Sequence, residues 1–213
     1  MNRIDDYLEL KNRIVNWIKD YANDNNIQSL VVGVSGGIDS AVVSTLCSET
    51  NVKPLKFDLT KTFETFKKTL NEYSHDDLSL ANTRSRLRMV TLYQIAGKYN
   101  GIVVGTGNKV EDYGVGFFTK YGDGGVDIAP IADLYKTEVW ELGKLLGVNE
   151  KIIEATPTDG LWDDKRTDED QLGFPYALLE EAMETGTGPG VQVLQRFNKS
   201  NQHKMQPIPT FKL

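Results

Sequence analysis

The stretch that decides the fold of this chain is Leu30-Val31-Val32-Gly33-Val34-Ser35-Gly36-Gly37-Ile38-Asp39-Ser40. It begins as an apolar, β-branched run, which is typical of a buried parallel strand. Two adjacent glycines then allow a sharp turn and a close approach of the backbone to a ligand. Residues 41–49 are predicted to be helical, so the turn leads into a helix N-terminus, where an anion is favoured.

The polar residues of this turn indicate a site for metal-bound pyrophosphate. Ser35 and Ser40 supply hydroxyl donors, whereas Asp39 would repel a bare phosphate unless a divalent cation lay between them. The stretch has neither the Walker A pattern nor the glycine spacing of a Rossmann fingerprint. The string Ser-Gly-Gly-x-Asp-Ser resembles the pyrophosphate loop of the ATP pyrophosphatases, which cleave ATP between its α and β phosphates. A glycine turn that only joins a strand to a helix is the structural alternative.

Length and composition limit the class of protein. A chain of 213 residues suits a single domain, 1–213. The net charge of −6 and the lack of a basic stripe argue against a nucleic-acid partner. The one cysteine, Cys47, excludes an internal disulfide and favours a reducing, cytoplasmic setting. A polar N-terminus and short apolar runs predict no signal peptide and no membrane partner.

Predicted strands alternate with predicted helices along the chain. Strands are expected at 30–34, 55–59 and 101–106, and helices at 4–21, 41–49, 79–99 and 135–146. Residues 156–173 are predicted to be a loop, followed by helices at 175–183 and 191–198 and a C-terminal tail, 199–213. This order predicts an α/β fold, a doubly wound open parallel sheet with flanking helices. Ligands of such sheets bind at the carboxyl ends of the strands.

Two further loops carry candidate chemistry. Glu111 and Asp112 follow the strand at 101–106, so either carboxylate can share Mg²⁺ with Asp39 at that sheet edge, although a solvated acidic loop is the alternative. Residues 117–131 combine aromatics, a lysine and glycines, a combination that suits a flat ring bearing an acid. A purely structural loop is also compatible with these glycines.

Together these strings resemble the ammonia-dependent NAD synthetase family, which implies the adenine nucleotide α-hydrolase-like fold. The resemblance covers most of the chain, and Phe-Phe-Thr-Lys-Tyr-Gly-Asp-Gly-Gly at 117–125 is its most specific motif. The other matching segments are the pyrophosphate loop, 82–89, 105–111, 134–139, 157–162, 167–173 and 203–209.

The resemblance implies a reaction and a set of site residues. The reaction is ATP-dependent amidation of nicotinic acid adenine dinucleotide (deamido-NAD) to NAD with ammonia, through an acyl adenylate, with release of AMP and pyrophosphate. The implied catalytic residues are Asp39, Lys136 and Lys120, and Asp39 and Glu111 are the implied Mg²⁺ ligands. The implied ATP-binding residues are Gly33, Ser35, Gly36, Gly37, Ile38, Asp39, Ser40, Thr106, Lys136 and Thr158. The implied dinucleotide-binding residues are Arg86, Phe117, Lys120 and Asp127.

The choice between Glu111 and Asp112 stays open in the sequence. Counting forward from Thr106 selects Glu111, whereas counting back from Phe117 is ambiguous by one residue. The resemblance also implies a homodimer. Ammonia is the expected nitrogen source, because the single cysteine lies on the apolar side of a predicted helix and a glutaminase needs an activated nucleophile.

The chain departs from the family between Val52 and Asp58. Family members have a strand and a helix there, whereas here the two residues are almost adjacent. Either the chain lacks this segment or the sequence as read omits it, and a missing inner strand would leave a gap in the sheet. Two alternative functions follow: another adenylating ATPase of the amidotransferase type, or, with a true deletion, a nucleotide-binding protein without turnover.

Overall fold

The computed structural model describes residues 3–57, 76–157 and 167–212. Its sheet contains β1 (Ser29–Gly33), β2 (Lys53–Phe57) and β3 (Gly101–Val104), in the order β2-β1-β3. Both neighbours run parallel to β1, with Ser29 opposite Lys53 on one side and Gly101 on the other. The carboxyl ends of β1 and β3 therefore meet at one edge, as predicted.

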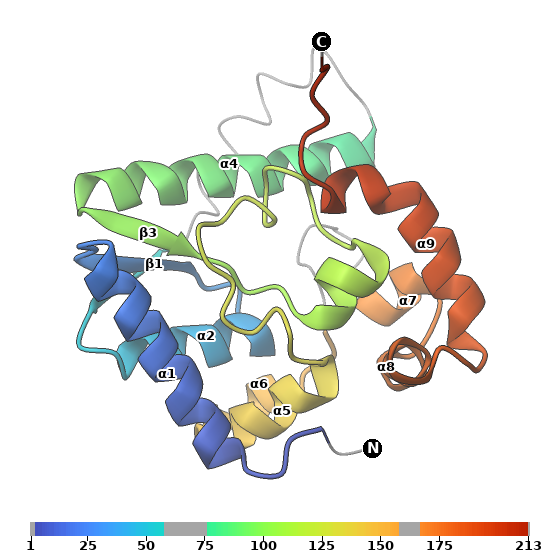
Figure 1. The fold of residues 1–213 in the computed structure, drawn as a ribbon, viewed down its shortest axis with the longest axis horizontal. Helices are drawn as coiled ribbons and strands as arrows, with labels where there is room; N and C mark the ends of the chain where they lie inside the picture. The colour runs from blue at the N-terminus through green and yellow to red at the C-terminus, as the bar shows by residue number, and fades with distance from the viewer. Residues whose placement is uncertain (1–2, 58–75, 158–166, 213) are drawn as a thin grey trace.

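Helices cover both faces of this sheet (Figure 1). One face carries α1 (Tyr7–Asp24), α2 (Ile38–Ser48) and α5 (Lys136–Leu145), and the other carries α4 (Asp77–Lys98). Alternate residues of β1 point to opposite sides, as the strand period requires. Leu30 and Val32 join the core under α1 and α2, while Val31 packs against Ile95 of α4. The doubly wound parallel sheet is confirmed.

A second apolar cluster lies beside the carboxyl edge of the sheet. It joins the π-helix η1 (Val110–Val115) to α7 (Asp168–Leu172), α8 (Tyr176–Thr185) and α9 (Gly190–Met205). The short helix α6 (Glu150–Ile153) follows α5 and lies next to it (Figure 1). In the described part of the chain, no helix is both long enough and apolar enough to cross a bilayer.

Two predictions for the C-terminal part of the chain are wrong. Residues 156–173 were expected to be a loop but contain α7, which Thr167 caps: its backbone N–H donates to Asp170 Oδ2 and its hydroxyl accepts from the Asp170 N–H, both at 3.0 Å. Helix α9 was expected to end at residue 198 but continues to Met205. Residues 199–205 of the predicted tail are therefore helical. This end of α9 contacts the loop after η1, which stabilises the additional turns.

Among the described residues, the sheet shows no gap beside β1 of the kind that a missing inner strand would leave. The chain passes from α2 to β2 without interruption, and β2 pairs with β1 over its whole length. β1 thus has a paired neighbour on each side, and the absence of a segment between Val52 and Asp58 stays a prediction. β2 begins two residues earlier than the predicted strand at 55–59, and residues 58–59 lie outside the described residues.

Candidate active site

The pyrophosphate loop has the predicted strand–turn–helix geometry. Gly36 adopts a φ of +90°, a conformation that favours glycine, and α2 begins at Ile38 with no side-chain cap. Ser40 Oγ donates to the Gly37 carbonyl at 3.0 Å and accepts from the Ser35 N–H at 3.1 Å. Ser35 Oγ accepts from the Gly37 N–H at 3.3 Å. The two hydroxyls hold the turn in shape in front of the N-terminus of α2.

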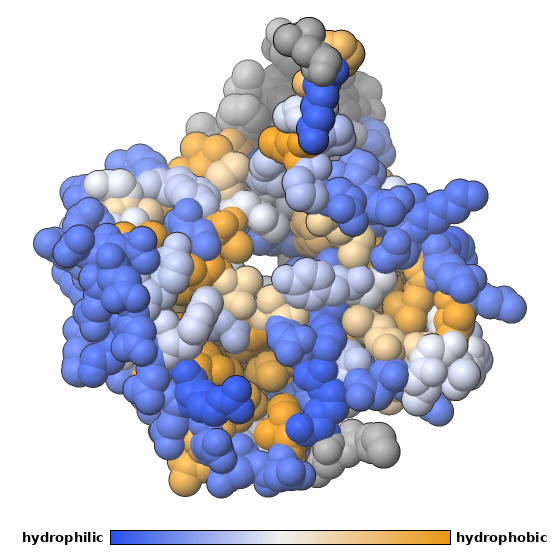
Figure 2. Space-filling model, viewed as in Figure 1, coloured by the Kyte–Doolittle hydropathy of each residue, from blue (hydrophilic) through white to orange (hydrophobic). Residues whose placement is uncertain are grey.

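A cavity of about 590 Å³ opens at the carboxyl ends of β1 and β3. This volume lies in the range typical of small-molecule sites. In Figure 2 the molecule is hollowed near the centre of the face shown, between the part that carries the sheet and the part that carries α9. The predicted site residues that line the cavity are Gly33, Ser35, Gly36, Asp39, Ser40, Thr106, Glu111 and Phe117.

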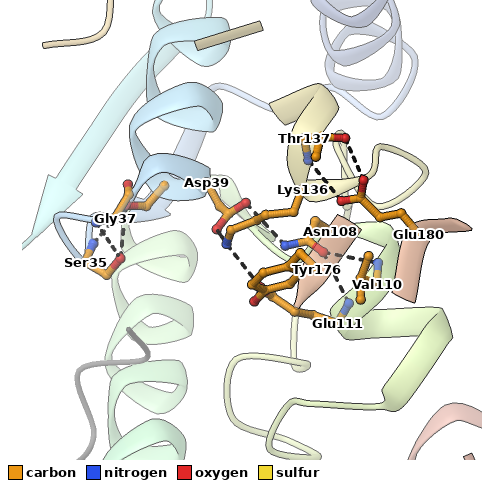
Figure 3. A network of polar contacts seen from close by, with 11 residues as sticks. Ser35, Gly37, Asp39, Asn108, Val110, Glu111, Lys136, Thr137, Tyr176 and Glu180 are labelled. Atoms are coloured by element: carbon orange, nitrogen blue, oxygen red, sulfur yellow. Dashed lines mark hydrogen bonds and ion pairs between the residues drawn. The ribbon is translucent and has the colours of Figure 1, made fainter. Parts of the chain in front are cut away.

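Lys136, the first residue of α5, joins the two predicted metal ligands (Figure 3). Its Nζ lies 2.5 Å from Asp39 Oδ2 and 3.1 Å from Glu111 Oε1. The Lys136 side chain is only 2% exposed, against 17% for Asp39 and 16% for Glu111. Burial lowers the pKa of Lys136, but the two carboxylates outweigh burial and hold this pKa above its ordinary value. A permanent ammonium therefore bridges the two loops.

The N-terminus of α5 is itself held by carboxylates, which fixes the starting point of the Lys136 side chain. Glu180 of α8 accepts from the Thr137 N–H at 3.0 Å and from the Thr137 hydroxyl at 2.6 Å. Glu138 accepts from the Tyr135 N–H at 2.8 Å and is paired with Arg3 at 3.0 Å. Negative side chains are favourable at this end of a helix.

Tyr176 is a site residue that the sequence analysis missed. Its hydroxyl donates to Glu111 Oε1 at 2.7 Å, and its ring centroid lies 5.2 Å from Lys136 Nζ. Burial, together with the nearby charges of Glu111 and Asp168, raises the pKa of this phenol, so it stays a donor. In sequence, Tyr176 looks like any core aromatic near the start of a helix.

The π-helix separates Glu111 from Asp112. Asn108 Oδ1 accepts from the Glu111 N–H at 3.2 Å, and Glu111 points to Lys136. Asp112 lies against Gly107 instead, where an added Cβ would meet its carboxylate oxygens at 2.4 Å. Burial, and then the charge of Glu111, raises the pKa of Asp112 to about 7. The structure thus separates the two carboxylates between which counting back from Phe117 was ambiguous.

Helix α9 forms hydrogen bonds to the loop that carries the Phe-Phe-Thr-Lys motif, residues 117–125. Lys204 Nζ donates to the Phe118 carbonyl at 2.7 Å, and Asn201 Nδ2 donates to the Val115 carbonyl at 2.8 Å. In the opposite direction, Lys120 Nζ donates to the His203 carbonyl at 2.9 Å. These contacts join residues more than 80 positions apart, so no local pattern indicates them.

The remaining predicted residues are engaged with the protein or lie outside the described residues. Arg86 is exposed on α4, and its Nε donates to the Lys120 carbonyl at 3.2 Å. Asp127 accepts from the Val103 N–H at 2.8 Å and from the Tyr93 hydroxyl at 3.0 Å, which ties its segment to β3 and α4. Thr158 lies outside the described residues.

Comparison with known proteins decides the family. A family model described as NAD synthase matches residues 10–54 and 49–208. The NH(3)-dependent NAD(+) synthetase of Carboxydothermus hydrogenoformans is 36% identical over 230 residues, which cover 92% of this chain and 94% of that protein. The chain belongs to the NAD synthase family. It is therefore a carbon–nitrogen ligase by family, and the resemblance of its motifs is confirmed.

Solved structures agree with this assignment. NMN synthetase from Francisella tularensis has a TM-score of 0.86 and 31% identity, covering 98% of this chain and 99% of that one. NH3-dependent NAD synthetase from Campylobacter jejuni has a TM-score of 0.75 at 24% identity, covering 98% of this chain and 100% of that one, and shows the same fold. The predicted fold class is confirmed.

The lengths of the relatives bear on the short connection before β2. An alignment of 230 positions exceeds the 213 residues of this chain, so the Carboxydothermus protein has residues without a counterpart here. The two matches to the family model overlap at 49–54, from the residue after α2 to the second residue of β2. That the shortening lies between Val52 and Asp58 stays a prediction, which this overlap supports.

Proposed function

We propose that this member of the NAD synthase family amidates nicotinic acid adenine dinucleotide to NAD, with ATP and ammonia as co-substrates. The observation that carries the proposal is the Lys136–Asp39–Glu111 cluster at the pyrophosphate loop, in a chain of this family. A solvated acidic loop would not bury a lysine between its carboxylates. A protein that only binds MgATP would use the same cluster, so it is the match to a family of NAD synthases that favours turnover.

The chemistry follows from the poor reactivity of a carboxylate. Its oxygen attacks the α-phosphorus of ATP, the bond to the β-phosphate breaks, and pyrophosphate leaves. Ammonia then attacks the acyl carbon of the adenylate, the acyl–oxygen bond breaks, and AMP leaves with that oxygen. No covalent protein nucleophile is needed, so the protein contributes positioning and charge neutralisation.

The pyrophosphate loop and α5 are proposed to hold the ATP phosphates. Ser35, Ser40 and the backbone N–H groups at the start of α2 provide donors at one edge of the sheet. Lys136 provides a cation on the other side of Asp39 (Figure 3). Gly33, Gly36, Gly37, Ile38, Thr106 and Thr158 complete the proposed ATP site.

The donor set fits magnesium. Asp39 and Glu111 already converge on one cation, the Lys136 ammonium, so their oxygens face a common point. Among the described residues there is no cluster of three or more metal-ligating side chains. Magnesium commonly binds one or two carboxylates and takes its other ligands from phosphates and water. When bound, it would neutralise the phosphate charge that develops during adenylation.

The loop after η1 is proposed to receive the pyridine carboxylate. Phe117 lines the cavity. Lys120, Arg86 and Asp127 are the proposed polar partners, and none of the three lines the cavity in this structure. Because Lys120 donates to the His203 carbonyl in this structure, the substrate carboxylate would compete with that carbonyl for the ammonium. A charged acceptor is the stronger of the two.

Ammonia is the proposed nucleophile, in agreement with the names of the curated relatives. Cys47 is fully buried on α2 and belongs to the main apolar cluster, so glutamine cannot reach it. The site also has no need of a histidine for nucleophilic catalysis. A homodimer and a cytoplasmic location remain part of the proposal.

Amidation of nicotinic acid mononucleotide is a second candidate reaction. The observation that favours it is the match to NMN synthetase from Francisella tularensis, in which both chains are covered almost completely. NMN is the amide of that mononucleotide. Both candidates use the same adenylation chemistry and the same cluster.

One set of assays separates these candidates. The purified protein is given MgATP, ammonium chloride and one of the two acids, and amide, AMP and pyrophosphate are quantified. We expect the three products in equal amounts, and the ratio of the two kcat/KM values identifies the physiological acid. Formation of ADP and phosphate instead would overturn the adenylation mechanism.

The nitrogen source is tested with glutamine that has been freed of ammonium. We expect no sustained amide formation. Glutamate release that matches amide formation, and that is lost in Cys47→Ala, would contradict the proposal.

A further inference from the structure

The Lys136 ammonium contacts both of the carboxylates that the proposed function assigns to Mg²⁺. One of these carboxylates, Asp39, lies in the first turn of α2, and the other, Glu111, lies in the first turn of η1. One oxygen of Glu111, Oε1, accepts from Lys136 at 3.1 Å and from the Tyr176 hydroxyl at 2.7 Å. The Asn108 side chain reaches Asp39 Oδ1 at 3.4 Å. The two carboxylates are thus oriented toward the ammonium by neutral donors behind them.

Charge balance allows only one cation at a time between Asp39 and Glu111. Two carboxylates facing each other without a cation would repel at short range, and the low exposure of this cluster weakens screening by solvent. A divalent cation that took both carboxylates would in turn repel the ammonium. The metal and the lysine therefore cannot both occupy the point between Asp39 and Glu111.

We infer that Lys136 acts as a stand-in cation in the nucleotide-free protein and must leave Asp39 and Glu111 when the metal–nucleotide complex binds. The inference rests on the Mg²⁺ ligands of the proposed function. The lysine side chain is long and flexible, and its helix start is held by Glu180 and Glu138, so its end can move while its backbone stays fixed. The ATP phosphates would then be its new partners.

Two consequences follow for binding. A free divalent cation has to displace an internal ion pair and finds only two carboxylates, so it binds weakly. The metal–nucleotide complex brings acceptors for the displaced ammonium, so it binds tightly. Metal and nucleotide are therefore coupled, and each raises the affinity for the other by the same factor.

The test uses Mn²⁺ as the probe, with binding to metal-free protein measured by calorimetry and by the loss of the free-ion EPR signal. The variants are Lys136→Met, which keeps a long, unbranched side chain and removes its charge, and Lys144→Met as a matched control. Lys144 lies on the same helix, is 56% exposed and pairs with Glu141. We expect Lys136→Met to bind free Mn²⁺ at least about tenfold more tightly than the wild type and MnATP at least about tenfold more weakly. Lys144→Met should change neither affinity.

Unchanged or weakened binding of free Mn²⁺ to folded Lys136→Met would overturn the inference. If that variant is unfolded without metal, circular dichroism with added Mn²⁺ decides: recovery of the native spectrum supports the inference, and no recovery overturns it. The double variant Asp39→Asn/Lys136→Met should lose the gain in Mn²⁺ affinity, and retention of that gain would show that the ion binds elsewhere.

These binding measurements require no turnover. Wild-type protein that forms neither amide would contradict the proposed function alone, whereas the Mn²⁺ result would contradict the stand-in role alone.

Discussion

Glu111 and Asp112 are neighbours in sequence but belong to different electrostatic environments. Glu111 faces a buried ammonium and a phenol, and so its charge is neutralised where it lies. Asp112 packs against Gly107 in the same cavity, and its pKa is raised to about 7. The comparison teaches that two neighbouring carboxylates at the edge of a sheet are not equivalent. The one that already contacts a buried cation is the better candidate for a metal ligand.

The largest effect is expected from removing the negative charge of either proposed metal ligand, in comparison with removing that of Asp112. Asp39→Asn and Glu111→Gln should each lower Mg²⁺-dependent turnover about a hundredfold or more, because each removes a charge from the proposed ion site. Asp112→Asn should change turnover by less than about threefold. Rates are measured across a magnesium titration, with circular dichroism to verify folding. Loss of turnover in Asp112→Asn but not in Glu111→Gln would transfer the ligand role to Asp112.

A smaller effect is expected from the phenol that orients Glu111. Tyr176→Phe keeps the ring beside Lys136 and removes only the hydroxyl bond to Glu111. We expect the magnesium concentration at half-maximal rate to rise about three- to tenfold, with a smaller change in kcat at saturating magnesium. Tyr135→Phe is the matched control, because its hydroxyl also donates to a carboxylate, Glu184, at 3.0 Å. Equal shifts in the two variants would mean that the effect is one of general stability.

The end of α9 should affect the acid substrate and not ATP. Lys204→Met removes the hydrogen bond to the Phe118 carbonyl and loosens the loop that carries Phe117 and Lys120. We expect the KM for the acid to rise about fivefold with the KM for ATP unchanged, since only substrate positioning is lost. Lys199→Met, at an exposed position of the same helix, is the control. A rise of the same size in the KM for ATP would argue against separate regions of the site for the acid and for ATP.

The smallest effect concerns stability and pH. The pKa of Asp112 is about 7 in the folded protein and near 3.8 when unfolded, so the folded state binds more protons between these values. The free energy of unfolding of the metal-free protein should therefore fall as pH rises from about 4 to about 7. Asp112→Asn should remove this part of the slope and raise the free energy of unfolding at pH 8 by about 1 to 3 kcal/mol. Urea denaturation at several pH values measures both, and identical slopes would refute the burial of a charge at Asp112.

The strand–turn–helix core of the site could be predicted because its signals are local. A β-branched run, a glycine pair and a serine five residues after the first serine determine the loop, and the structure has the expected hydrogen bonds between Ser35 and Ser40. The meeting of β1 and β3 at one edge followed from the parallel sheet. The start of α7 had a local signal too, Thr167 with Asp170, which the sequence analysis overlooked.

The rest of the site depends on contacts between distant residues. Lys136 meets Asp39 across 97 positions, Tyr176 meets Glu111 across 65, and Lys204 meets Phe118 across 86. No pattern within a segment encodes such pairs, because they depend on how α5, α8 and α9 pack around η1. The π-turn is similar: one additional residue in a helix leaves no mark in composition, yet it decides which carboxylate faces the lysine.

The adenylation of the acid by ATP is tested most directly by following an oxygen atom. The acid substrate is prepared with oxygen-18 in its carboxylate and incubated with the protein, MgATP and ammonium chloride, and the products are analysed by mass spectrometry. The account predicts one labelled oxygen in AMP and an amide that keeps the other, with unlabelled pyrophosphate. Labelled inorganic phosphate, formed together with ADP, would contradict it.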